Sequence, residues 1–217
     1  MTLRKALEFM SKQMTNAQKG WLLAGIILLI VLLDQALKIY IKLNFCLGEA
    51  VEVFPWWQIC FIENNGMAFG IEWFGKLFLT LFRIVAVGLL IWYMVELIRK
   101  HIRMGYLVMI ALVTAGALGN IIDCMFYGLI FSESTINEAA HLVPFGEGYA
   151  PFFYGKVVDM LYFPLITNSA GEVLFFRPVF NLADSAITVS VILILLFFRK
   201  DLNDTLTNEK ETKQVEA

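Results

Sequence analysis

Four long apolar stretches constrain the fold of this chain more than any other feature. They cover approximately residues 21–41, 77–98, 104–127 and 178–198. Each reaches the roughly 20 residues that a helix needs to cross a bilayer. The composition agrees, because 59% of the residues are apolar or aromatic and 17% are charged, against about 45–50% and 25% in soluble domains. The sequence therefore predicts an all-α membrane protein built on a four-transmembrane-helix bundle.

The remaining composition and motifs exclude several other kinds of protein. The net charge is −2, so no nucleic-acid partner is expected. The three cysteines form no Cys-x-x-Cys pair, only two histidines occur, and P-loop, dinucleotide-loop, G-x-S-x-G and H-E-x-x-H motifs are missing. We therefore expect neither a metal nor a cofactor. Cys46 and Cys60 could pair outside the membrane, or the cysteines could serve as small apolar residues.

The charges between the spans indicate how the chain is oriented. Lys and Arg residues precede the first span and return at Arg99, Lys100 and Arg103, whereas the connections 43–76 and 128–177 carry mainly acidic residues. Lys and Arg gather on the cytoplasmic side of membrane proteins. Both termini are therefore expected in the cytoplasm, with the two long loops outside.

Three regions follow along the chain. Residues 1–20 are expected to form an amphipathic cytoplasmic segment, residues 21–199 one membrane domain, and residues 200–217 a disordered cytoplasmic tail. Residues 51–63 mix β-forming and aromatic side chains and predict short strands. Residues 141–155 contain repeated Pro and Gly and predict an extended loop. The expected bundle thus carries a small extracytoplasmic β-containing region and an extended outer loop.

Charged residues within residues 21–41, 77–95 and 178–198 lie near the expected outer face. Asp34 and Lys38 stand four residues apart, which is the spacing of an ion pair on one helix face, and we interpret this pair as structural. Asp123 directly follows the charge-free residues 104–122 of the third stretch, and Asp184 lies about 9 Å from the outer start of the fourth. Each such group costs at least ~2.5–3.5 kcal/mol in a membrane. The sequence therefore predicts one polar site at the outer face.

Two asparagines accompany these carboxylates. Asn120 and Asn181 each precede an aspartate by three residues, a spacing that places both side chains on one helix face. Side-chain amides can hold a carboxylate by hydrogen bonds that lipid does not provide.

Several of the charged residues have a structural interpretation as well as a functional one. Arg83 is interpreted as a snorkelling or charge-balancing residue, and Asp123 as a helix cap or a brace for the outer loop. Asp159 flanks a span, so it is either an ordinary loop acid or a catalytic group. Asp184 has no basic neighbour in sequence, which makes it the strongest functional candidate.

Two facing carboxyl groups are sufficient for peptide hydrolysis. Like charges in a low-dielectric site share one proton, so the ionised acid can activate water while the protonated acid polarises the amide carbonyl. The alternatives are a small proton-coupled transporter that uses Asp34 and Asp184, and a scaffold whose acids only tie helices together. Transport favours sites near the midplane, whereas the inner halves of residues 21–41, 77–95, 104–122 and 178–198 carry no Asp, Glu, Lys or Arg.

Five stretches resemble, in order, the motifs of bacterial lipoprotein signal peptidase, also called signal peptidase II; these are residues 34–38, 64–69, 119–123, 157–159 and 180–187. The resemblance implies a membrane aspartyl endopeptidase that cleaves diacylglyceryl-modified prolipoproteins before the lipidated cysteine. It also implies a location in the bacterial inner membrane, with the active site at the outer face. The expected partners are the prolipoprotein and membrane lipids, and the protein is expected to be a monomer.

The resemblance assigns roles to individual residues. Asp159 and Asp184 match the catalytic dyad of the family. The other matching positions would line, brace or support the substrate site, and they are Asp34, Lys38, Asn64, Gly66, Asn120, Asp123 and Asn181.

The chain departs from the family pattern at two places. Cys124 follows Asp123 where the family usually has an arginine. The stretch 128–158 is also longer than the short turn common in the family. We expect this insertion either to hold or cover the substrate, or to be an inert elaboration.

Overall fold

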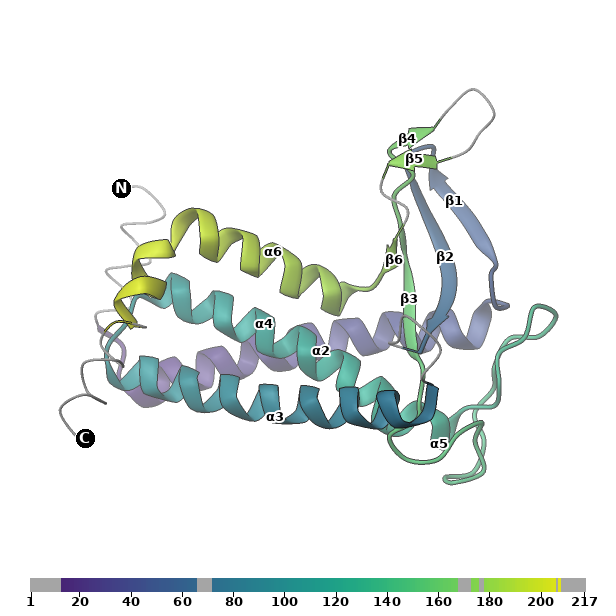
Figure 1. Ribbon diagram of the computed structural model, residues 1–217, viewed down its shortest axis with the longest axis horizontal. Coiled ribbons are helices and arrows are strands. Elements are labelled where there is room, and N and C mark those ends of the chain that lie inside the picture. Colours follow the sequence, from purple (N-terminus) through teal and green to yellow (C-terminus); the bar gives the residue numbers. More distant parts are fainter. Residues whose placement is uncertain (1–12, 66–71, 168–172, 176–177, 206, 208–217) are drawn as a thin grey trace.

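Four long helices form the body of the molecule in the computed structural model, which describes residues 13–65, 72–167, 173–175, 178–205 and 207. The helices are α2 (Asn16–Asn44), α3 (Glu72–Arg99), α4 (Met104–Ile122) and α6 (Leu182–Phe197). Figure 1 shows them running along the long axis of the molecule, with the strands standing across one end. The mostly helical fold with a small β region is thereby confirmed.

The helices have the length and composition of membrane spans. Among the described residues, three helices are long and apolar enough to cross a membrane, and they are Asn16–Asn44, Gly75–Arg99 and Met104–Ile130. Helix α6 meets the same criteria when it is counted together with residues 199–205, which bend away from it by 86°. The predicted bundle therefore has three spans, or four if this bent pair forms one.

Two predicted boundaries differ from the observed elements. Helix α2 begins at Asn16 because Thr15 caps it: Thr15 Oγ1 accepts from Gln18 N at 3.2 Å, and Gln18 Oε1 accepts from Thr15 N at 2.8 Å. The expected amphipathic segment lies largely outside the described residues, since residues 1–12 are not described. The tail expected to be disordered, residues 200–217, is helical over residues 200–205, and residues 206 and 208–217 lie outside the described residues. The helical part is tied to the bundle by Arg103 and Asp201, 3.2 Å apart.

Helix α4 lies at the centre of the bundle and packs against α2, α3 and α6. Close approach to α6 requires glycine at residue 116, because a Cβ there would collide with the backbone oxygen of Ala183. Away from the sheet, the helices bury an apolar cluster that includes Leu23, Leu97 and Leu107. The outward faces carry large exposed apolar side chains, as expected for helices surrounded by lipid.

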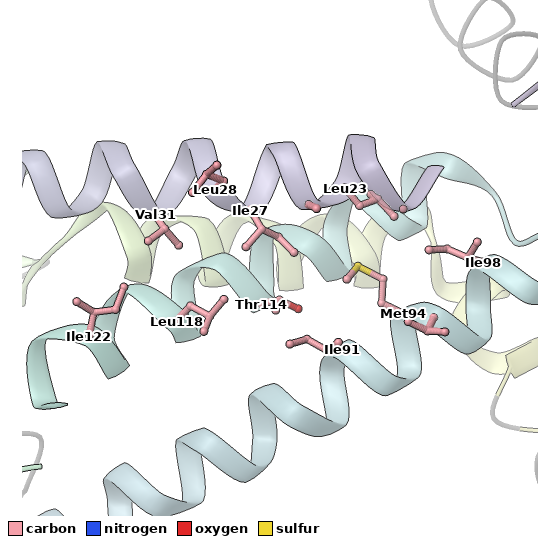
Figure 2. A pocket seen from close by; sticks show the side chains of 13 residues that line it. Leu23, Ile27, Leu28, Val31, Ile91, Met94, Ile98, Thr114, Leu118 and Ile122 are labelled. Carbon is pink, nitrogen blue, oxygen red and sulfur yellow. The ribbon is translucent and has the colours of Figure 1, made fainter. Parts of the chain in front are cut away.

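An apolar cavity of about 410 Å³ lies between α2, α3 and α4. Figure 2 shows Leu23, Ile27, Met94 and Leu118 around it. Its lining contains no ionisable side chain, so the cavity is separate from the polar site that the sequence predicts.

A four-stranded antiparallel sheet has the order β1-β2-β3-β6, with strands Ala50–Phe54, Trp57–Asn64, Val157–Tyr162 and Val179–Phe180. The strands predicted within residues 51–63 are confirmed as β1 and β2. A separate pair, β4 (Ile166–Thr167) and β5 (Val173–Phe175), lies beyond them. The pairing of β2 with β3 places Ile62 opposite Asp159. The sheet thus brings a residue of the predicted dyad to the end of the helices.

The chain leaves α4 through a π-helix. Residues Asp123–Tyr127 form this π-helix, η1, and Gly128–Ile130 form the short helix α5. Residues 131–156 then run as an extended loop with one isolated bridge, Phe131 to Leu142. Phe131 and Ala140 are buried against Phe61 of β2. The predicted extended loop is therefore confirmed, and part of it packs onto the sheet, while Ile136 and Phe145 farther along it are exposed.

Candidate active site

Lys38 is the centre of a buried ionic group between α2 and α4. Its Nζ lies 2.9 Å from Asp34 Oδ2 and 2.7 Å from Asp123 Oδ2, and it donates to Asn120 Oδ1 at 2.9 Å. The side chains of Lys38, Asp34 and Asp123 are 0–1% exposed. The predicted Asp34–Lys38 ion pair is thereby confirmed, and the structure adds Asp123 to it. An ammonium with two carboxylates and an amide around it is compensated in a way that a lone buried charge is not.

Asp34 joins α2 to the start of α6. Its Oδ1 accepts a hydrogen bond of 2.9 Å from the Ala183 N–H, one of the amide groups in the first turn of a helix that lack intrahelical partners. The carboxylate fits because Gly119 of α4 has no side chain: a Cβ there would lie 2.7 Å from Asp34 Oδ2.

Asp123 joins η1 to α2 and β3. Its Oδ1 accepts from Gln35 Nε2 at 2.8 Å, and its Oδ2 accepts from the Val158 N–H at 3.3 Å. Gln35 in turn accepts from the Tyr127 hydroxyl at 3.1 Å. π-Helical turns occur frequently at functional sites, and this one directs Asp123 toward the strand that carries Asp159.

Gln35 and Tyr127 are contributors that the sequence analysis missed. Gln35 lies inside the motif 34–38, and a polar amide in an apolar stretch is the signal that could have identified it. Tyr127 offers no comparable signal, because a tyrosine at the end of a span is common at membrane interfaces.

Asp159 and Asp184 are held by the same asparagine. Asn181 Nδ2 donates to Asp159 Oδ1 at 2.7 Å, while Asn181 Oδ1 accepts from Asp184 N at 2.9 Å. Asn64 Nδ2 donates to the other oxygen of Asp159 at 3.2 Å. Asn120 Nδ2 donates to Asp184 Oδ1 at 2.8 Å. The first turn of α6, strand β3, strand β2 and α4 thus converge on the two carboxyl groups.

Burial and a neighbouring charge make the Asp159 carboxyl a weaker acid than an ordinary aspartate. Burial of this carboxyl, which is 3% exposed, is the largest effect and the charge of Asp184 the next, and together they raise the pKa of Asp159 to about 7. Hydrogen bonds from Asn64 and Asn181 and the charge of Lys38 act in the opposite direction. A carboxyl with a pKa near neutrality beside a second carboxyl has the properties of an acid–base pair.

The structure brings together all the predicted site residues that it describes. Gly66, the remaining predicted site residue, lies outside the described residues.

Arg83 stands apart from this network and donates from Nη1 to Cys124 Sγ at 3.4 Å, which puts a guanidinium beside the residue that departs from the family pattern. Cys46 and Cys60 are free thiols. In the described part of the chain, no group of three or more His, Cys, Asp or Glu residues could hold a metal ion.

A second charged cluster was also missed. Lys42, Glu63, Ser134 and Lys156 meet at the end of α2 beside the sheet. In the sequence Glu63 is one of several acidic residues of the connection 43–76, and its partners lie far from it along the chain.

The fold and the site define a membrane protein in which helices and a small sheet bring two carboxyl groups into one polar network. The family model for signal peptidase (SPase) II matches residues 26–199. The chain belongs to this family.

Relatives and solved structures agree with this assignment. The lipoprotein signal peptidase of Porphyromonas gingivalis is 43% identical over 211 residues, which cover 93% of each chain. That of Amoebophilus asiaticus is 33% identical, over 92% of this chain and 87% of the relative. A bacterial membrane enzyme structure solved by the in meso method at 1.9 Å has a TM-score of 0.58 and 27% identity, over 82% of this chain and 93% of that one. A second, solved at 2.3 Å, has a TM-score of 0.56 and 28% identity, over 84% and 90%.

Proposed function

We propose that this chain is a membrane aspartyl endopeptidase that removes signal peptides from diacylglyceryl-modified prolipoproteins by cleaving before the lipidated cysteine. One observation carries the proposal: the carboxyl groups of Asp159 and Asp184 both accept hydrogen bonds from Asn181, Asp159 Oδ1 from its Nδ2 at 2.7 Å and Asp184 Oδ2 from its N–H at 3.3 Å, in a chain that belongs to the signal peptidase II family. The family and its relatives make the chain a peptidase, and the paired carboxyl groups supply the catalytic type.

The reaction follows from a pair of carboxyl groups that share one proton. The raised pKa of Asp159 favours this residue as the carboxyl that holds the shared proton at neutral pH. Asp184, ionised, removes a proton from water as the water oxygen attacks the peptide carbonyl carbon. Asp159 gives its proton to the carbonyl oxygen, and a gem-diol forms. When the C–N bond breaks, Asp184 passes the proton taken from water to the leaving nitrogen, and one hydroxyl of the gem-diol returns a proton to Asp159.

The remaining predicted residues act around the dyad in this proposal. The amides of Asn64, Asn120 and Asn181 orient the two carboxyl groups. Lys38 of α2 pairs with Asp34 and with Asp123 at the end of α4, and these ion pairs hold the two helices together beside the dyad. Gly66, two residues after Asn64, would line the substrate site.

The substrate explains where such a site belongs. A diacylglyceryl group stays in the bilayer while water arrives from the aqueous side, so the reaction suits the end of the bundle rather than its middle. With the positive charges before the first span and at residues 99–103 on the cytoplasmic side, the active site faces outward in the bacterial inner membrane. Both termini are then cytoplasmic. We further propose that the protein acts as a monomer in contact with membrane lipids.

The proton-coupled transporter is not supported. The family is one of peptidases. The transporter would use Asp34, but this carboxylate pairs with Lys38 and accepts a hydrogen bond from the Ala183 N–H in the first turn of α6.

Cleavage of a diacylglyceryl-modified prolipoprotein by the purified protein in detergent tests the proposal. Wild type should cleave, and Asp159→Asn and Asp184→Asn should each lower the rate by at least about 10³-fold while remaining folded. Glu138→Gln, which alters an exposed acid of the outer loop, is the matched control and should cleave as wild type does. Equal cleavage by the Asn variants, or none by a folded wild type, would contradict the proposal.

A further inference from the structure

The extended loop is attached to the sheet through the second charged cluster. Glu63 Oε1 pairs with Lys42 Nζ, and Glu63 Oε2 lies 3.0 Å from Lys156 Nζ. Ser134, from the loop, accepts from Lys42 Nζ at 2.9 Å and donates to Glu63 Oε1 at 3.0 Å. Side-chain exposure is 0% for Lys42 and 3% for Glu63, so these charges depend on one another for compensation.

Tyr149 completes the cluster from the far side of the loop. Its hydroxyl accepts a hydrogen bond of 2.6 Å from the Lys156 N–H. Its ring centroid lies 4.9 Å from Lys42 Nζ and 5.2 Å from Lys156 Nζ, which are cation–π distances. One aromatic ring therefore contacts both cations that hold Glu63.

Glu63 is ionised in this setting. Burial alone would raise the pKa of Glu63, but Lys42 and Lys156 hold this pKa below its ordinary value. A buried charge pair is strongly destabilising when one partner is lost, because the other remains desolvated and uncompensated. Ser134 and Lys156 therefore help to keep the Glu63 carboxylate next to Lys42.

The cluster lies directly beside the proposed catalytic residues along both strands. Glu63 precedes Asn64 at the end of β2, and Lys156 immediately precedes β3, which carries Asp159. Glu63 stands opposite Val158 in the pairing of β2 with β3, whose register shifts between Ile59 and Ile62. A slip of one residue would turn every side chain of a strand to the other face. The charged cluster around Glu63 lies next to this register shift, so it can determine the direction of the Asn64 side chain.

We infer that Glu63, Ser134, Tyr149 and Lys156, together with Lys42, are positioning residues: they fix the register of β2 against β3 and so hold the Asn64 amide on Asp159. The inference rests on the proposed function, because it assigns the insertion a role in preparing the dyad. It makes the loop a support behind the site rather than a cover over the substrate.

The pH dependence of cleavage reports this role. Asp159 faces Asp184 from α6, Lys38 from α2, Asn64 from β2 and Asn181 from the start of α6. Of these, Asn64 is the group that the cluster positions. Loss of its donated hydrogen bond removes stabilisation of the ionised form, so the pKa of Asp159 rises. Activity that requires one proton on the dyad then persists to higher pH.

The test compares pH–rate profiles of Tyr149→Phe and Glu63→Gln with wild type, using the same prolipoprotein in detergent. Tyr149→Phe keeps the ring and changes no charge, so it remains informative if Glu63→Gln fails to fold. The alkaline limb of kcat should move to higher pH by about 0.5–1 unit in each folded variant. We expect kcat to fall about 3- to 10-fold, with KM within about twofold of wild type.

Glu133→Gln is the matched control, because Glu133 also approaches Lys156, at 3.6 Å, but is 68% exposed. Its profile should superimpose on that of wild type. An alkaline limb that stays in place or moves to lower pH in folded Tyr149→Phe overturns the inference, and so does a raised KM with an unmoved limb, which would mean that the loop binds substrate. These outcomes differ from failure of the proposed function, in which wild type itself would not cleave.

Discussion

Asn181 Nδ2 lies 2.7 Å from Asp159 Oδ1, and this contact ties the first residue before α6 to the middle of strand β3. Asn181 also caps α6, since its Oδ1 accepts from the Asp184 N–H at 2.9 Å. One side chain therefore fixes the start of a membrane helix and the position of a proposed catalytic carboxyl. Stability and activity are coupled at this residue.

Asn181→Ala and Asn181→Ser should separate these two roles. Alanine removes both, and we expect it to lower the free energy of unfolding by about 1–2 kcal/mol through the lost cap. Serine can still cap the helix but lacks the amide that donates to Asp159, so it should recover most of the stability while activity stays low. Thermal unfolding and prolipoprotein cleavage in the same detergent measure the two quantities. A serine variant with full activity would show that the Asp159 contact is dispensable.

Gly119→Ala should destabilise the protein because the new methyl group meets Asp34. A Cβ at Gly119 lies 2.7 Å from Asp34 Oδ2 and 3.1 Å from Ala183 Cβ, and overpacking of this kind costs about 1–3 kcal/mol. Gly88→Ala is the matched control in another membrane helix, since nothing lies within 4 Å of its added Cβ. We expect a lower unfolding temperature and reduced cleavage for the first variant, and a neutral or stabilising effect for the second. Equal unfolding temperatures for both would refute the close contact.

The sequence predicts the helices well because each depends on a local pattern. Continuous apolar residues specify the spans, and the Asp34–Lys38 pair follows from a spacing of four residues on one helix. Thr15 and Gln18 form a capping box that is also readable from the sequence. These features need no knowledge of how distant segments meet.

The site depends on distant segments, and physical reasoning from the sequence could only place its parts at the same depth. Asp159 reaches Asn181 because β3 pairs with β2 on one side and β6 on the other, and strand pairing between remote segments has no local signal. The resemblance to a family supplied that association. The cluster around Glu63 was missed for the same reason, as its partners come from α2, the loop and the start of β3.

Lys38→Met should be among the most damaging single substitutions. It leaves the buried carboxylates of Asp34 and Asp123 without their ammonium, and breaking a buried pair in this way costs about 3–5 kcal/mol. Lys100→Gln is the control for an exposed pair, because Lys100 is 40% exposed and lies 3.7 Å from Glu96; it should cost about 0–1 kcal/mol. Unfolding in detergent compares the two. Adding Asp34→Asn and Asp123→Asn to Lys38→Met should restore part of the loss, and a further loss would contradict the charge-compensation argument.

The acid strength of Asp159 predicts how stability depends on pH. Its pKa rises on folding from an ordinary 3.8 to about 7, so the folded state binds this proton more tightly than the unfolded chain does. The stabilisation is complete below the unfolded pKa and is lost as pH rises through the folded value; it amounts to up to about 4 kcal/mol. Wild type should therefore unfold at progressively lower temperature from pH 4 to 8. Asp159→Asn should lack this decline and be the more stable protein at pH 8, whereas Glu138→Gln should follow wild type. Parallel pH curves for wild type and Asp159→Asn would show that burial and Asp184 do not perturb this carboxyl.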